Sequence, residues 1–165
     1  MSETCVVADA GPLIGLARIG KLELLRSLFS STIIPPAVYD ECVRAPDKPG
    51  AAAIAQAVND RWLTMRTLSN PAAETLTIGL GLGEREAILL ALELQCPVLV
   101  DDKLARAAAR SAGLRVIGTG GLLLAAKSRS LIPSVGRTLA QLQDNGYHFS
   151  GELVTRILEL AGEKR

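Results

Sequence analysis

Short apolar runs alternate with helical patterns along the chain. Residues 5–8, 32–34, 97–100 and 115–118 are rich in valine and isoleucine, and a turn signal follows each run. Apolar runs of this length without a polar side are typical of parallel strands that are buried on both faces. Their alternation with helices predicts an α/β fold. Residues 62–66 are a candidate for an extra edge strand.

Apolar residues at three- and four-residue spacings predict the helices. Between residues 13 and 28 they indicate two short helices that are interrupted near Gly20. Pro36 suits the first turn of a helix over residues 36–44, which the prolines and glycine of segment 46–50 end. Further helices are predicted over residues 51–59, 84–95, 103–112, 120–128, 134–144 and 151–161. We expect residues 1–165 to form a single domain.

The composition is that of a folded domain and provides no general attraction for polyanions. Hydrophobic residues make up 48% of the 165 residues and charged residues 21%, while 18 Lys and Arg against 17 Asp and Glu leave a net charge of +1. A polyanion must therefore be bound by a local basic patch. Aromatic residues make up 3% and are scattered, which argues against single-strand binding by base stacking.

The N-terminus and the cysteines favour the cytoplasm. The first residues lack the basic start and apolar stretch of a signal peptide, and no apolar run approaches the roughly 20 residues that cross a bilayer. Cys5, Cys42 and Cys96 are odd in number and far apart. We therefore expect reduced, mostly buried thiols in a cytoplasmic protein without membrane association.

Acidic residues follow two of the predicted strands. Asp9 ends the first strand, and Asp101 and Asp102 end the strand over residues 97–100. Ligands of open α/β sheets gather at the carboxyl ends of strands, so these acids are expected to converge. An aspartate at a strand end also commonly caps the next helix, and either position alone fits that role equally well.

Two further acids suit the same cleft. Glu41 lies on the helix that opens at Pro36, and Glu84 opens a helix after the glycine-rich run 79–83. For Glu84 alone, complementing the helix dipole is the commoner role. Four carboxylates in one cleft raise each other's pKa unless a cation binds them. Oxygen ligands without Cys or His favour Mg²⁺ or Mn²⁺, which usually serves phosphate chemistry.

Candidate phosphate contacts follow the aspartate pair. Lys103, Arg106 and Arg110 stand at i, i+3 and i+7 and share one helix face, although a solvated face is the commoner reason for such a stripe. Thr119 follows Gly118 at the end of a strand. Helix capping and substrate contact are equal alternatives for its hydroxyl.

Other chemistries find little support. His148 is the only histidine and no Gly-x-Ser-x-Gly motif is present, which argues against a Ser-His-Asp hydrolase. The stretch 15–21 resembles the start of a phosphate-binding loop, but Leu22 stands where a hydroxyl would bind Mg²⁺. Leu123 stands where a dinucleotide-binding motif has its last glycine, which argues against a dinucleotide site. Asp9 lacks the second acid two residues on that many phosphoaspartate hydrolases require.

Four segments together resemble the PIN-domain family, and more narrowly the VapC-like branch of prokaryotic toxin nucleases. They are Val6-Val-Ala-Asp9-Ala-Gly-Pro-Leu-Ile14, Ile34-Pro-Pro-Ala-Val-Tyr-Asp-Glu41, Gly81-Leu-Gly-Glu84-Arg-Glu-Ala-Ile88 and Val98-Leu-Val-Asp-Asp102-Lys-Leu-Ala-Arg106. The matches occur in order and cover about residues 5–130. Their specificity lies in the combination.

The resemblance implies a PIN-like three-layer α/β/α sandwich with a short, mostly parallel sheet of four or five strands. It further implies an endoribonuclease that depends on Mg²⁺ or Mn²⁺. By position, the catalytic acids are Asp9, Glu41, Glu84 and Asp102. Asp101 is an additional metal ligand or orienting group and the alternative to Asp102, and Glu86 is the alternative to Glu84.

Partners are implied by the same resemblance: an RNA substrate, a second copy in a homodimer and a small antitoxin protein. The helices from Ser134 onward lie beyond the match, and they either cover the sheet, extend a dimer surface or contact the antitoxin. The competing hypothesis is a catalytically inert PIN-like binding or regulatory module. In such a module the acids serve as caps and surface charge.

Overall fold

One parallel sheet organises the chain in this computed structural model, which describes residues 4–69 and 79–163. Its strands are β1 (Cys5–Ala8), β2 (Ser31–Ile34), β3 (Leu63–Met65), β4 (Val98–Leu99) and β5 (Val116–Ile117). The sheet order is β3-β2-β1-β4-β5, and every pair is parallel. The predicted α/β class and short parallel sheet are confirmed, and segment 62–66 supplies the edge strand β3.

Helices connect the strands close to where the apolar periodicity predicts them. They are α1 (Ala10–Arg18), α2 (Glu23–Leu28), α3 (Pro36–Val43), α4 (Ala51–Asn59), α5 (Leu82–Leu94), α6 (Lys103–Ser111), α7 (Thr119–Ser128), α8 (Val135–Asp144) and α9 (Gly151–Leu160). Helix α4 has the expected ends, and the other ends differ from the expected ones by at most three residues, because caps and turns rather than periodicity set the last turn. Within the described ranges, no helix is both long and apolar enough to span a membrane.

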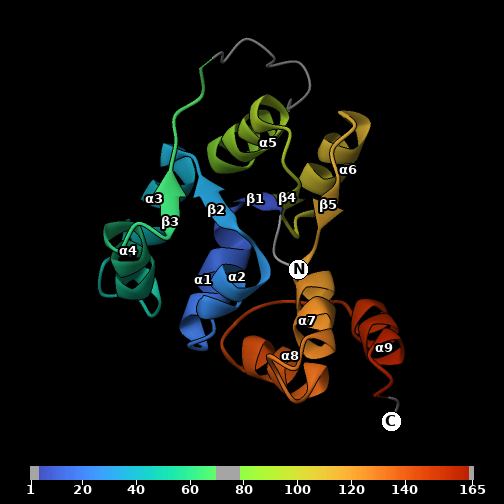
Figure 1. Cartoon of the computed structure of the whole chain (residues 1–165). Coiled ribbons are helices and arrows are strands. Elements are labelled where there is room, and N and C mark those ends of the chain that lie inside the picture. Colours follow the sequence, from blue (N-terminus) through green and yellow to red (C-terminus); the bar gives the residue numbers. More distant parts are fainter. Residues whose placement is uncertain (1–3, 70–78, 164–165) are drawn as a thin grey trace.

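The order of the strands creates a crevice beside β1. From β1 the chain builds outward through β2 and β3 on one side, and it then crosses to add β4 and β5 on the other side (Figure 1). Val7 pairs with Ile33 of β2 and with Val98 of β4. The connections that leave the carboxyl ends of β1 and β4 therefore diverge. Such a switch point is where open α/β sheets bind ligands.

Two helical layers enclose the sheet. Helix α5 packs on β1 and β4 and contacts α3 and α6, whereas α2 packs on β2 and contacts α7. Figure 1 shows α5 and α6 on one side of the sheet and α1, α2 and α7 on the other. Fully buried Val6, Leu16, Leu90 and Leu122 join both layers to one hydrophobic core. The predicted three-layer arrangement is confirmed.

The cysteine prediction was wrong. Cys5 and Cys96 form a disulfide, and only Cys42 is a free thiol among the described residues. Val7 pairs with Val98, so Cys5 lies opposite Cys96 at the amino ends of neighbouring strands, with their Cα atoms 5.8 Å apart. Their sequence separation of 91 conceals this pairing in the sequence. Disulfides are rare in the reducing cytosol, so the cysteines no longer support a cytoplasmic location.

The C-terminal helices pack on α7 and α1 and extend the core. Leu139 and Leu142 of α8 and Ile157 of α9 are almost fully buried. Glu163 ties α7 to the start of α8, because its carboxylate accepts hydrogen bonds from Lys127 Nζ, Ser134 Oγ and two backbone amides of α8 at 2.8–3.0 Å. These donors, led by Lys127, lower the pKa of Glu163 to about 2.

Candidate active site

Asp9 is buried at the crevice between β1 and β4. It occupies the position before α1, but its side chain makes no capping hydrogen bond, and only 6% of the residue is exposed. Its Oδ1 atom is buried without a hydrogen-bond partner among the described residues. Burial raises the pKa of Asp9 to about 7; a backbone hydrogen bond of Ala10 opposes this shift, and nearby carboxylates add to it. An acid held in this way is a candidate functional group.

The carboxylates that act on Asp9 are the ones selected from the sequence. In decreasing order, the negative charges of Glu84, Glu41 and Asp102 raise its pKa. They come from α5, α3 and the turn before α6, three segments that are far apart in the sequence. The fold therefore brings the four predicted acids into electrostatic contact.

Glu41 reaches the cluster over a glycine. It lies near the end of α3, and its carboxylate is seated against Gly83 in the first turn of α5. A Cβ atom on Gly83 would lie 2.9 Å from the carboxyl carbon of Glu41, which is closer than real contacts allow. Sequence reasoning noted the glycine-rich run but not this role. The absence of a side chain at position 83 lets Glu41 approach Glu84.

Glu84 and Glu86 have different surroundings, although both follow the same glycine run. Glu84 accepts a hydrogen bond from the Gly81 amide at 3.2 Å. Burial raises the pKa of Glu84; the Gly81 bond opposes the shift, and the charges of Asp102 and Glu41 add to it. Glu86 instead accepts a hydrogen bond from the Ala37 amide at 3.3 Å, in the first turn of α3. Glu84 therefore belongs to the cluster, while Glu86 links two helices.

Asp101 and Asp102 are adjacent in the sequence but make different contacts. Asp102 caps α6, because its Oδ2 accepts a hydrogen bond from the Ala105 amide at 2.9 Å, and its charge acts on Asp9 and Glu84. Asp101 faces α7 instead. It accepts hydrogen bonds from the Thr119 amide at 2.8 Å, from the Thr119 hydroxyl and from the Tyr147 hydroxyl. Asp101 thus fixes the strand end from which Asp102 projects.

Tyr147 is a site neighbour that sequence reasoning missed. It lies between α8 and α9, and burial, with the charge and hydrogen bond of Asp101, raises its pKa well above the usual range. The charge of Asp9 adds to this shift, so the phenol lies near both aspartates. Its ring packs against Gly15 of α1, where a Cβ would lie 2.9 Å from the ring. Two glycines on α1, at positions 11 and 15, were the only signal of this close approach.

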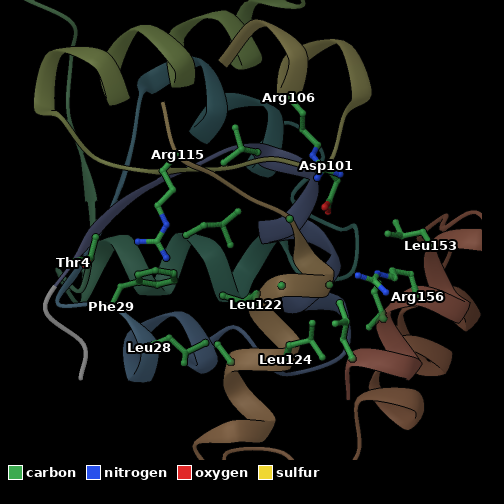
Figure 2. Close-up of a pocket in the computed structure, with 18 of the residues that line it drawn as sticks. Thr4, Leu28, Phe29, Asp101, Arg106, Arg115, Leu122, Leu124, Leu153 and Arg156 are labelled. Carbon is green, nitrogen blue, oxygen red and sulfur yellow. The ribbon is translucent and has the colours of Figure 1, made fainter. Parts of the chain in front are cut away.

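The predicted phosphate contacts on α6 differ in their exposure. Lys103 and Arg110 are exposed on α6, whereas Arg106 is half-buried and lines a groove of about 560 Å³ between β5, α7 and α9. Figure 2 shows Arg106 beside Asp101 at one end of this groove, with Arg115 and Phe29 toward the other end. Thr119 is buried, and its hydroxyl donates to Asp101. Thr119 reaches the cluster only through that carboxylate.

Thiol chemistry is not supported at this site. Cys42 is buried beneath Glu41, and burial, followed by the charges of Glu41 and Asp9, raises the pKa of its thiol to about 12. His148 is exposed. The acids therefore stay the candidate functional side chains of the crevice.

The carboxylates do not form a closed metal cage by themselves. Within residues 4–69 and 79–163, no three Cys, His, Asp or Glu side chains converge to the spacing of a metal site. Like charges keep carboxylates apart unless a cation lies between them. The residues nevertheless suit a hard divalent cation, because the cluster offers only oxygen donors and the Oδ1 atom of Asp9 has no other partner.

Fold and crevice together define an α/β domain with an acidic cleft at its switch point. A family model described as DUF3368, PIN domain, matches residues 5–163. The chain belongs to this PIN-domain family, so the predicted family is confirmed. PIN domains are generally nucleases and typically use divalent metals.

One solved structure is similar in fold. It is described as a PilT N-terminus domain protein, SSO1118, from the hyperthermophilic archaeon Sulfolobus solfataricus P2. Its sequence identity to this chain is 21%, the TM-score is 0.57, and the similarity covers 74% of this chain and 93% of that one. No curated protein matches the chain.

The buried charge of Asp9 predicts a pH-dependent cost in stability. A carboxyl whose pKa is raised by folding stabilises the protein below its unfolded pKa, near 4, and loses that contribution as pH rises through about 7. The stability advantage of metal-free Asp9→Asn over the natural chain should therefore grow between pH 5 and pH 8.5, by on the order of 2–3 kcal/mol. Urea unfolding at both pH values measures this difference. Exposed Asp40→Asn is the control, and an equal gain there would contradict the assignment to Asp9.

Proposed function

We propose that this protein is an endoribonuclease that hydrolyses RNA phosphodiesters and depends on Mg²⁺ or Mn²⁺. The observation that carries the proposal is the buried Asp9, whose unpartnered oxygen faces a crevice surrounded by three more acids. Only a cation relieves that repulsion while keeping the acids charged. Membership of the PIN-domain family, whose members are generally nucleases, supports the same reaction.

Each acid has a distinct part in this proposal. Asp9 provides the central oxygen ligand, and Glu84, Asp102 and Glu41 approach it from three sides, with Asp101 as the group that orients Asp102. These oxygens would hold the divalent cation, which when bound would offset the carboxylate charge and supply an activated water for phosphodiester hydrolysis. Burial of Asp9 excludes bulk water from one side of the crevice, which strengthens every electrostatic interaction there.

The biological setting is also proposed. The resemblance to the VapC-like branch supports a toxin that acts as a homodimer in the cytoplasm and is restrained by a small antitoxin. The net charge of +1 means that RNA must be held by local cations rather than by the whole surface. The alternative is an inert PIN-like module, which predicts that calorimetry with Mn²⁺ detects no binding, with or without RNA.

Substituting the acids should separate catalysis from structure. Asp9→Asn, Glu84→Gln and Asp102→Asn are expected to lower the rate of cleavage of single-stranded RNA at least 100-fold in Mn²⁺, because each removes a charged oxygen of the cluster. The controls Asp40→Asn, beside Glu41 on α3, and Glu86→Gln, on α5 with Glu84, lie outside the cluster and should stay within about threefold. Initial rates on labelled RNA provide the measurement. Undiminished cleavage by purified Asp9→Asn would identify a contaminant and remove the proposed function.

The glycine under Glu41 offers a test that leaves every carboxylate in place. Gly83→Ala places a methyl group against the Glu41 carboxyl and should lower cleavage roughly 10- to 100-fold, because small displacements of catalytic groups have effects of this size. Gly121→Ala is the matched control, because a Cβ there meets no atom within 4 Å. Circular dichroism verifies folding. If both variants cleave equally, Glu41 does not act from this position.

A further inference from the structure

A basic pocket adjoins the acidic cluster on the far side of Glu41. It has a volume of about 210 Å³ and lies between the end of α1 and the turn after α3. Its charged lining consists of Arg18, Arg44, Lys48 and Glu41. The volume suits a single anionic group rather than a whole nucleoside. Glu41 contributes to both the pocket and the cluster, so a ligand that is long enough can occupy them together.

Arg18 lines this pocket and carries an unsatisfied donor. Its Nη1 atom donates to the backbone oxygen of Asn145 at 3.2 Å, which holds the guanidinium in place. Its Nε atom is buried and has no hydrogen-bond partner among the described residues. Leaving a buried N–H group of a charged side chain without a hydrogen bond costs free energy of folding. A bound acceptor would remove this cost.

The turn after α3 holds the other two cations close to Arg18. Gly50 adopts φ +94° and packs so tightly on α1 that a Cβ there would lie 3.0 Å from the Cβ of Ala17. The Ala51 amide donates to the backbone oxygen of Lys48 at 3.2 Å, which closes the turn. Arg44 caps the end of α3. The end of α1 and the turn after α3 therefore meet at the pocket.

The pocket is short of negative charge. In the described part of the chain, Arg18, Arg44 and Lys48 have no carboxylate oxygen within 4.0 Å, and Glu41 is the only acid in the lining. Cations commonly complement the C-terminal ends of helices, and Arg18 and Arg44 stand at such positions. That role accounts for each residue singly but not for the unpaired Nε atom.

We propose that Arg18, Arg44 and Lys48 bind a phosphate of single-stranded RNA next to the one that is cleaved. This inference rests on the proposed nuclease function and names a part of its substrate site. Arginine forks and lysine ammonium groups are the usual ligands of phosphate oxygens. Arg18 lies nine residues beyond Asp9 on α1, about 13 Å along the helix, so the phosphate belongs to a neighbouring nucleotide of the same strand.

The test replaces the two exposed cations and leaves the half-buried Arg18 in place. Arg44→Gln/Lys48→Gln is compared with Arg61→Gln/Arg137→Gln, a control of equal charge at exposed positions away from the pocket. KM and kcat on single-stranded RNA are measured in Mn²⁺. RNA affinity is measured separately by fluorescence anisotropy with the Asp9→Asn chain at several salt concentrations.

The pocket variant should raise KM roughly 5- to 20-fold with kcat within twofold, and the slope of log affinity against log salt should fall by about 0.7, one phosphate contact on a single strand. The control should change neither quantity. If RNA is cleaved but the pocket variant behaves like the control, the pocket proposal is overturned and the nuclease function stands. If no RNA is cleaved but the pocket variant still loses affinity and slope, the nuclease function fails and the phosphate site stands.

Discussion

Burial of a carboxylate among like charges is the constraint on which this structure depends. Asp9 lies at the end of the central strand β1, where the chain has turned away from β4, and its Oδ1 atom has no hydrogen-bond donor among the residues that the structure describes. Glu84, Glu41 and Asp102 then bring further negative charge toward it. A protein without use for this arrangement would relieve it by one neutral substitution. The cost in stability is therefore best explained by a ligand of positive charge.

Contacts around the cluster decide which acids remain available. Asp101 and Glu86 are engaged by protein donors, the first by Thr119 and Tyr147 and the second by the start of α3. In Asp102 and in Glu84, a protein donor engages only one of the two carboxylate oxygens. The negative charge of Asp102 raises the pKa of Glu84, and both charges raise the pKa of Asp9. Two glycines leave room for larger side chains near the cluster: Gly83 accommodates the carboxylate of Glu41, and Gly15 accommodates the ring of Tyr147. Glycine and hydrogen-bond geometry thus select the reactive acids from a larger set.

The sequence predicted the fold class and nearly all element positions, because apolar periodicity depends on local order along the chain. The roles of the four acids stay a prediction, although the structure places Glu84, Glu41 and Asp102 where their charges act on Asp9. It did not decide between Asp101 and Asp102 or between Glu84 and Glu86, since these choices depend on hydrogen bonds to α7 and α3. The Cys5–Cys96 disulfide was missed because it requires the register of β1 against β4. Tyr147 was missed because it approaches Asp101 only after α8 and α9 have packed.

The most direct test of the central claim is anomalous diffraction from crystals soaked in Mn²⁺. The account predicts a single strong peak in the crevice, about 2.0–2.3 Å from the Oδ1 atom of Asp9 and within reach of an oxygen of Glu84 or Asp102. A crystal at saturating Mn²⁺ that shows no peak there, with Asp9 Oδ1 hydrogen-bonded to a protein donor instead, would contradict it.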